Sequence, residues 1–231
     1  CGKDRLAVVA PLDDVLRLQS EGFQILDVRD AVDFEGSHLK GVIGISLNGK
    51  YATWCGSLLN HDDPIIVIAD IGDEHEAVMR LGRIGFDNIA GYLRDGMRAL
   101  VSRPDLIEVT QRITASTVGE QLRSSDPPAI LDVRSAQERD NVGFVEGSIN
   151  IPLMHLDARL NELPTDRPLM VHCAGGYRSA IACSVLQRNG INCTDMVGGF
   201  KAWLASKLPI VEPAANAACA ANLSGIAATR D

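Results

Sequence analysis

The chain contains one ordered set of segments twice, which restricts its possible folds more than any other feature. Four pairs of segments match in the same order: residues 25–30 (ILDVRD) with 130–135 (ILDVRS), 64–68 with 168–172, 83–85 with 188–190, and 91–92 with 199–200. A fixed order of matching segments indicates a tandem duplication. Each copy has the size of one small domain. We expect domains over residues 1–108 and 109–210, joined through 100–108, and an Ala-rich tail over 211–231.

Each copy alternates strand-like and helix-like segments. In the second copy, a helix capped by Thr114 precedes a β run that ends at residues 132–134. A short strand over 149–152 and an apolar strand over 168–171 follow, and the last strand lies near Met196. Alternating strands and helices predict an α/β fold with a largely parallel sheet. We therefore expect two small, mostly parallel sheets, each flanked by helices.

Charge and cysteine usage narrow the functional class. The net charge of −8 argues against nucleic acid or an anionic membrane as a partner. No apolar run approaches the roughly 18 residues that a membrane span requires. The six cysteines form no C-x-x-C pair, which is typical of a reduced, cytoplasmic protein. Because no His/Cys cluster has zinc-ligand spacing, we expect no metal in this segment.

The sequence around Cys173 has the composition of a nucleophile loop. The cysteine follows an apolar strand, Gly175 and Gly176 follow it, and a helix-like stretch begins near Ser179. Glycines let a loop turn sharply and leave its backbone amides open, and a helix N-terminus favours negative charge. Such surroundings favour the reactive thiolate of a cysteine. We predict that Cys173 is a nucleophile that carries sulfur, rather than a buried structural cysteine.

The neighbours of Cys173 have separate predicted roles. Arg178 is expected to complete an anion cradle, because a guanidinium offers several fixed donors. Backbone N–H groups of Ala174 and Tyr177 are expected to face the same anion. Ser179 is either a helix N-cap or a hydroxyl that stabilises the loop. The predicted binding loop comprises Ala174, Gly175, Gly176, Tyr177, Arg178 and Ser179.

Three polar residues lie next to this loop in the predicted sheet. Asp132 and Arg134 leave the end of a strand, where open α/β sheets place their sites, so we predict that they support the site. The alternative is a purely structural ion pair, with Arg134 facing Glu138. His172 is expected to point away from the site, since a preformed thiolate needs no general base.

Four ordered motifs of the second copy resemble those of a rhodanese domain. They are residues 132–134 (DVR), 147–152 (GSINIP), 173–179 (CAGGYRS) and 198–203 (GGFKAW). The resemblance, over residues 113–208, implies a sulfurtransferase that moves sulfane sulfur from thiosulfate or a low-molecular-weight persulfide to a thiol or cyanide. The sulfur would travel as a Cys173 persulfide, so small donors and thiol acceptors are the implied partners and no cofactor is implied. Phe144 stands where many members have histidine, which we expect to affect packing.

The first copy resembles the same family in outline but lacks the site. Where the second copy has its loop, residues 69–76 read ADIGDEHE, without cysteine or arginine. Carboxylates there would repel an anionic sulfur donor and destabilise a thiolate. Cys55 lies outside this loop and is not a replacement nucleophile. We predict that the first copy is catalytically silent.

Two further stretches resemble a narrower group. Residues 50–56 (KYATWCG) and 83–92 (RIGFDNIAGY) are similar to bacterial fusions of a metallo-β-lactamase-fold domain with two rhodanese-like domains. The upstream domain of such fusions resembles non-haem iron persulfide dioxygenases or glyoxalase-II-like hydrolases. The resemblance implies a partner domain of that fold, with iron or zinc confined to it. A start at Cys1 fits a segment cut from such a protein, and also fits a lipoprotein.

Two other functions compete for the same residues. The sequence from His172 to Arg178 also resembles the cysteine phosphatase and arsenate reductase signature, which places one residue more between Cys and Arg. The four residues present here make a smaller cradle, suited to one sulfur atom, and no Asp general acid is evident. The other alternative is a sulfur-relay or docking module, which we expect of the first copy. Whether the chain forms an oligomer stays open.

Overall fold

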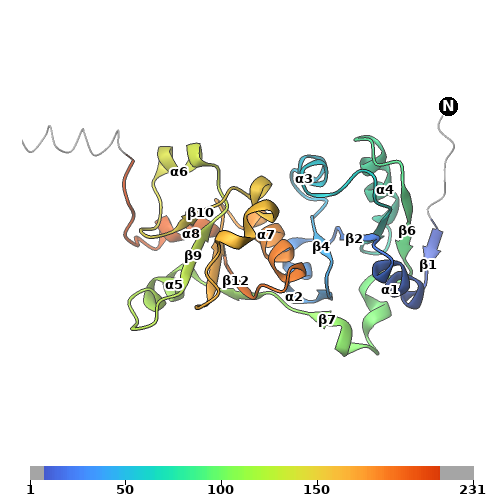
Figure 1. Ribbon diagram of the computed structural model, residues 1–231, viewed down its shortest axis with the longest axis horizontal. Helices are drawn as coiled ribbons and strands as arrows, with labels where there is room; N and C mark the ends of the chain where they lie inside the picture. Colours follow the sequence, from blue (N-terminus) through green and yellow to red (C-terminus); the bar gives the residue numbers. More distant parts are fainter. Residues whose placement is uncertain (1–7, 214–231) are drawn as a thin grey trace, which may run out of the picture. The chain divides into compact units, whose positions relative to one another are not determined.

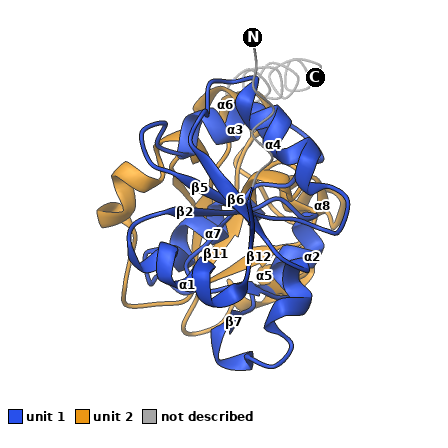
Figure 2. Cartoon of the chain, turned by 90° about the vertical axis from the view of Figure 1, so that its right-hand side faces the viewer, with its two compact units in different colours: residues 1–111, 180–192 blue, residues 112–179, 193–231 orange. Residues whose placement is uncertain are grey.

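The computed structural model describes residues 8–213, and the chain divides into two compact units (Figures 1 and 2). Unit 1 consists of residues 1–111 and 180–192, and unit 2 consists of residues 112–179 and 193–231. Each unit is built on a five-stranded sheet flanked by helices, so the predicted α/β class is confirmed. Most of the Ala-rich tail lies outside the described residues.

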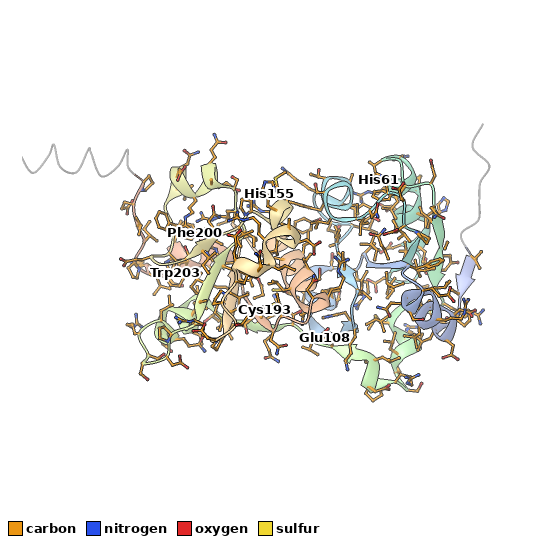
Figure 3. The ribbon with its side chains drawn as sticks, in the orientation of Figure 1. His61, Glu108, His155, Cys193, Phe200 and Trp203 are labelled. Carbon is orange, nitrogen blue, oxygen red and sulfur yellow. The ribbon has the colours of Figure 1, made fainter. Side chains whose placement is uncertain are left out.

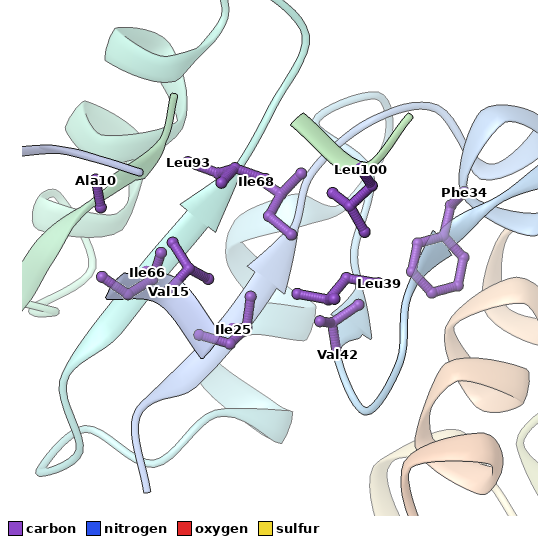
Figure 4. Packing of buried hydrophobic residues seen from close by; sticks show 10 residues of the cluster. All are labelled: Ala10, Val15, Ile25, Phe34, Leu39, Val42, Ile66, Ile68, Leu93 and Leu100. Carbon is purple, nitrogen blue, oxygen red and sulfur yellow. The ribbon is translucent and has the colours of Figure 1, made fainter. Parts of the chain in front are cut away.

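Unit 1 contains a parallel sheet with β5 at its centre. The sheet order is β1 (Val8–Ala10), β6 (Ile89–Leu93), β5 (Ile65–Ile68), β2 (Gln24–Asp27) and β4 (Ile43–Gly44). The helices are α1 (Leu12–Ser20), α2 (Ala31–Gly36), α3 (Tyr51–Leu58) and α4 (Glu74–Gly82). Every residue of β5 is buried, as expected for a strand covered on both faces of a parallel sheet. Ile25, Ile66 and Ile68 pack with Val15 of α1 in one core (Figure 4).

Residues 100–108 fold back onto unit 1 rather than forming an open connection. They follow η1 (Gly96–Leu100) and contain η2 (Pro104–Leu106) and β7 (Ile107–Glu108). Strand β7 pairs antiparallel with β3 (His38–Leu39). Leu106 and Ile107 pack against the core of unit 1. A two-residue strand is too short to show a period of two, so the sequence pattern gave no sign of it.

Unit 2 repeats this arrangement. The sheet order is β10 (Ile149–Asn150), β9 (Ala129–Asp132), β11 (Leu169–His172), β12 (Cys193–Met196) and β8 (Gln111–Ile113). The helices are α5 (Ala115–Gln121), α6 (Ala136–Val142) and α8 (Gly199–Ala205), with η3 (Leu153–His155) and η4 (Asp157–Glu162) between β10 and β11. Helix α7 (Tyr177–Arg188) begins in unit 2 directly after the Cys173 loop, and its residues from 180 onward are counted with unit 1. Thr114 caps α5 by accepting a hydrogen bond from the Thr117 amide, as predicted.

Strand register places the two copies in exact correspondence at the end of the central strand. His172 pairs with Asp132 in unit 2, and Ile68 pairs with Asp27 in unit 1. Ala69 of unit 1 is therefore the counterpart of Cys173. Five residues after Ala69 the chain has Glu74, the first residue of α4, whereas the same count from Cys173 reaches Arg178, the second residue of α7.

One match in the repeat needs correction. Gly91 lies inside β6, whereas Gly199 is the first residue of α8. The counterpart of Gly199 is Gly96, because both glycines contact the carbonyl that follows the central strand. A Cβ atom would lie 2.5 Å from the Ala69 carbonyl oxygen at Gly96, and 2.5 Å from the Cys173 carbonyl oxygen at Gly199.

No helix within residues 8–213 is long and apolar enough to cross a membrane. In the same part of the chain, no three His, Cys, Asp or Glu residues are grouped so that they can hold a metal ion.

Candidate active site

Strand β11 delivers Cys173 to the edge of the sheet in unit 2. All four residues of β11 are buried, and the strand lies between β9 and β12. Its last residue, His172, pairs with the last residue of β9, so Cys173 emerges where both strands end. Open α/β sheets place their sites at this carboxyl edge. The cysteine itself is only 2% exposed.

The loop after Cys173 directs a backbone amide at the sulfur. The Gly176 amide donates a hydrogen bond to the Cys173 Sγ over 3.1 Å. Gly176 has a φ of +110°, a conformation that side chains disfavour, so the turn that aims this amide requires glycine. The Ser179 hydroxyl donates to the Gly176 carbonyl oxygen over 2.9 Å. Since α7 begins at Tyr177, Ser179 stabilises the loop and is not an N-cap.

Arg178 is held over this loop by Glu138 of α6. Two guanidinium nitrogens of Arg178 each lie 2.6 Å from a Glu138 carboxylate oxygen. Glu138 also closes a capping box with Ser135 at the start of α6. The hydrogen bond from Arg178 is the main reason why the pKa of Glu138 falls to about 2. The pKa of Arg178 is raised, first by the hydrogen bond to Glu138 and also by the charge of the Cys173 side chain.

Asp132 and Arg134 form a buried ion pair beneath the loop. Their N–O distance is 2.6 Å, and both side chains are at most 2% exposed. The expected pair between Arg134 and Glu138 is not formed, because Glu138 faces Arg178 instead. The Arg134 guanidinium lies 4.0 Å from the centroid of the Phe200 ring, and it also donates to the Gly143 carbonyl oxygen (Phe200 is labelled in Figure 3).

The same pair occurs in unit 1, where no cysteine needs support. Arg29 and Asp27 are 2.7 Å apart and equally buried. A pair that recurs without the nucleophile favours the structural interpretation of Asp132 and Arg134. Their contribution to the site is to hold the strand end and α8 in place.

His172 contacts the backbone and the buried acid rather than the sulfur. Its Nδ1 lies 3.2 Å from the Cys173 carbonyl oxygen, and its Nε2 lies 3.9 Å from Asp132 Oδ2. Burial lowers the pKa of His172. A neutral imidazole in this orientation is not a base for Cys173, in agreement with the expected outward orientation.

Helix α8 supplies contacts that the sequence reasoning did not include in the site. The amides of Phe200 and Lys201 donate to the carbonyl oxygens of Cys173 and Ala174, over 2.7 and 3.0 Å respectively. This close approach requires the glycine at position 199, which has a φ of +58°. The sequence signal for it is the Gly198–Gly199 pair that opens the motif over residues 198–203. The helix also places Trp203 in the core of unit 2 (Figure 3).

Phe144 packs as predicted. Its ring lies 3.9 Å from the guanidinium carbon of Arg139, and its backbone forms a bridge with Val211. Neither contact involves the Cys173 loop.

The corresponding loop of unit 1 presents carboxylates. Ala69 is buried at the position of the nucleophile, and the Gly72 amide donates to the Glu74 carboxylate over 2.7 Å. The loop of unit 1 therefore leads into a helix that begins with the Glu74 carboxylate, whereas the loop of unit 2 leads to Arg178. Cys55 is fully buried in α3, and burial raises its pKa to about 12. Cys55 is therefore a packing residue.

Known proteins resemble both copies. The model of the rhodanese-like domain family matches residues 12–103 and 114–206. YqhL of Bacillus subtilis, an uncharacterized protein, is 38% identical over 97 residues, or 40% of this chain and 75% of YqhL. A protein named sulfurtransferase from Allochromatium vinosum is 27% identical over 106 residues, or 46% of this chain and 98% of that protein. The crystal structure of a rhodanese-like domain protein from Staphylococcus aureus is 32% identical over 41% of this chain and 91% of that chain, with a TM-score of 0.39.

Proposed function

Because this chain belongs to the rhodanese-like domain family, we propose that unit 2 is a sulfurtransferase that works through a persulfide on Cys173. One observation carries the proposal: the Gly176 amide donates to the Cys173 sulfur at the carboxyl edge of the sheet, and Glu138 holds Arg178 at the end of the same loop. Backbone donors and a fixed cation around one atom stabilise negative charge on that atom. The thiolate and the persulfide anion both carry such charge.

The first step is transfer from the donor. The Cys173 thiolate attacks the outer sulfur of thiosulfate, and a new S–S bond forms. The donor's own S–S bond breaks, and sulfite leaves with its electron pair. The product is a Cys173 persulfide anion. A low-molecular-weight persulfide reacts in the same way and releases its thiolate.

The second step returns the enzyme to its starting state. A thiolate acceptor or cyanide attacks the terminal sulfur of the persulfide, and the Cys173 thiolate leaves with the electron pair of the broken bond. The product is the acceptor's persulfide, or thiocyanate when cyanide is the acceptor. Such double displacement predicts ping-pong kinetics.

The dimensions of the loop favour sulfur over phosphate. Four residues separate Cys173 from Arg178, and the cysteine is 2% exposed. The terminal sulfur of a donor is a single atom, so it is small enough to reach a nucleophile in such a narrow loop. A tetrahedral phosphoryl group needs more amides around it and more open space above the nucleophile. We therefore rank phosphatase and arsenate reductase activity below sulfur transfer.

As a partner we propose an upstream domain of metallo-β-lactamase fold that exchanges persulfides with unit 2 in the cytoplasm. The support is the resemblance of residues 50–56 and 83–92 to fusion proteins of that kind. Unit 1 is then a silent domain that docks partners or subunits, since its loop carries Ala69 and Glu74 in place of Cys173 and Arg178.

Intact-protein mass spectrometry tests the proposal. The chain is incubated with thiosulfate and, separately, with glutathione persulfide, beside the Cys173→Ser variant. We expect a gain of one sulfur atom that cyanide removes and that the variant lacks. Turnover of an aryl phosphate without any sulfur adduct would move the assignment to a phosphatase. Full transfer by a folded Cys173→Ser variant would refute the role of Cys173.

A further inference from the structure

Lys201 lies beside the Cys173 loop and has no assigned role. Its amide donates to the Ala174 carbonyl oxygen over 3.0 Å, which fixes the start of its side chain next to the loop. A Cβ atom built on Gly175 would lie 4.0 Å from Lys201 Cδ, so the lysine methylenes run along Gly175. Gly175 is exposed and marks the outer side of the loop. The ammonium group is only two bonds beyond that Cδ atom.

The charges around the loop leave Lys201 as a cation without a carboxylate partner. Glu138 neutralises Arg178, and Asp132 neutralises Arg134, each at 2.6 Å. Within residues 8–213, the Lys201 side chain makes no hydrogen bond or ion pair, although it is exposed to solvent. The chain as a whole carries a net charge of −8, which repels anions at long range. A local cation at the loop offsets this repulsion where the donor must dock.

We propose that Lys201 is a substrate-recognition residue that binds the anionic group of the sulfur donor and thereby selects negatively charged donors. The inference rests on the proposed function of Cys173. Because Cys173 is 2% exposed, only the outer sulfur of a donor enters the loop. The rest of the donor, a sulfonate in thiosulfate, stays outside, next to Gly175. Lys201 lies at that place and offers a flexible point charge with three donors.

A pair of donors that differ by one charge separates this role from a structural one. Thiosulfate is a dianion and methanethiosulfonate is a monoanion, and both give up their outer sulfur, with sulfite or methanesulfinate as the leaving group. Dithiothreitol serves as a neutral acceptor. For Lys201→Met we expect kcat/KM for thiosulfate to fall about fivefold, the most that one exposed ion pair usually provides. For methanethiosulfonate, the fold decrease in kcat/KM caused by Lys201→Met is expected to be at most half as large. Lys201→Arg is expected to keep kcat/KM near the wild-type value for both donors.

Lys207 provides the matched control. It is an exposed lysine six positions later, beyond the C-terminal end of α8, so Lys207→Met makes the same change in net charge at the opposite end of this helix from the Cys173 loop. We expect no loss of kcat/KM in this variant. Added salt is expected to slow wild-type transfer from thiosulfate more than transfer by Lys201→Met, because salt screens the exposed charge.

Alkylation of Cys173 gives a readout that needs no sulfur transfer. Iodoacetate is anionic and iodoacetamide is neutral, and the ratio of their rates reports the local charge. We expect Lys201→Met to lower the iodoacetate-to-iodoacetamide ratio several-fold and Lys207→Met to leave it unchanged. Equal ratios and equal donor preference in wild type and Lys201→Met would overturn the inference. A wild-type chain that never accepts sulfur would instead refute the proposed function, whatever the alkylation shows.

Discussion

Glu138 and Arg178 are 40 residues apart in the sequence, yet their side chains form a two-pronged ion pair with both N–O distances at 2.6 Å. The pair ties the first turn of α6 to the beginning of α7, directly after the Cys173 loop. The orientation of the loop cation therefore depends on an acid that never faces the sulfur. Five consequences of this and related contacts are open to measurement.

Removing the charge of Glu138 is expected to impair sulfur transfer without unfolding the chain. Glu138→Gln keeps the shape of the side chain but leaves Arg178 without its counter-ion, so the guanidinium is free to leave the loop. We expect kcat/KM for thiosulfate to fall about tenfold, the effect of losing one charge-assisted hydrogen-bonded contact. Steady-state kinetics with the persulfide assay measure this. Unchanged kinetics would show that Arg178 holds its position without Glu138.

The same pair predicts a dependence of stability on acid. The pKa of Glu138 is lowered from its ordinary 4.5 to about 2, so the pair's contribution is complete above about pH 4.5 and disappears as the pH falls towards 2. The Glu138 side chain is 38% exposed, so solvent screening limits the contribution to about 1 kcal/mol. Urea unfolding of wild type and Glu138→Gln is expected to differ at pH 6 and to converge only as the pH falls towards 2. A constant difference across this range would contradict the assignment.

Gly199→Ala is expected to displace the Cys173 loop. The new Cβ would lie 2.5 Å from the Cys173 carbonyl oxygen and 2.9 Å from the Gly175 nitrogen, so the backbone must shift. Gly147→Ala is the matched control, because its φ of +73° carries the same strain but no atom lies within 4 Å. We expect Gly147→Ala to cost about 1–2 kcal/mol and to keep activity, and Gly199→Ala to lose most persulfide formation as well. Equal activity in the two variants would show that the contact is not limiting.

Supplying unit 1 with a cysteine is expected to leave it silent. In a Cys173→Ser background, Ala69→Cys places a thiol at the counterpart position, but Glu74 stands where the loop arginine should be. Nearby carboxylates disfavour a thiolate. We expect no sulfur on this thiol after incubation with thiosulfate, as judged by peptide mass spectrometry. Addition of Glu74→Arg is the informative comparison, and transfer by Ala69→Cys alone would show that the acidic loop is no barrier.

The buried Asp–Arg pairs are expected to stabilise the two units equally. Arg29→Met and Arg134→Met each leave an aspartate buried without its partner, which typically costs 3–5 kcal/mol. The chain has two tryptophans, Trp54 in unit 1 and Trp203 in unit 2. Fluorescence-detected urea unfolding of Trp54→Phe and Trp203→Phe backgrounds therefore reports on one unit at a time. A loss of stability confined to unit 2 would contradict the equal structural role of the two pairs.

The parts of the fold that the sequence predicted are those with a local pattern. Each of three features depends on only a few neighbouring residues: the buried strand β11, the glycines after Cys173 and the helix cap at Thr114. The structure has all three where they were predicted. The sequence repeat then predicted the corresponding strands and helices in unit 1. Strand β7 was missed because a strand of two residues has no periodicity to detect.

Partners in the site were harder to predict because they come from distant segments. The sequence offered Glu138 as a structural partner for Arg134, four residues away, whereas the structure pairs it with Arg178. Lys201 reaches the loop only because α8 begins against the Cys173 carbonyl. The repeat match at Gly91 failed for a related reason, since a Gly-aromatic pair occurs both inside β6 and at the start of α8.

Gly96 and Gly199 make the same kind of backbone contact in the two units, although the units differ in the residues expected to carry chemistry. Both units retain a glycine pressed against the carbonyl after the central strand, although only one unit has a thiol there. The glycine is thus a requirement of chain packing, and its presence does not diagnose activity. A genome survey that scores this glycine would count unit 1 as an enzyme. The informative markers are instead the pair of residues at positions 173 and 178, whose counterparts at 69 and 74 are alanine and glutamate.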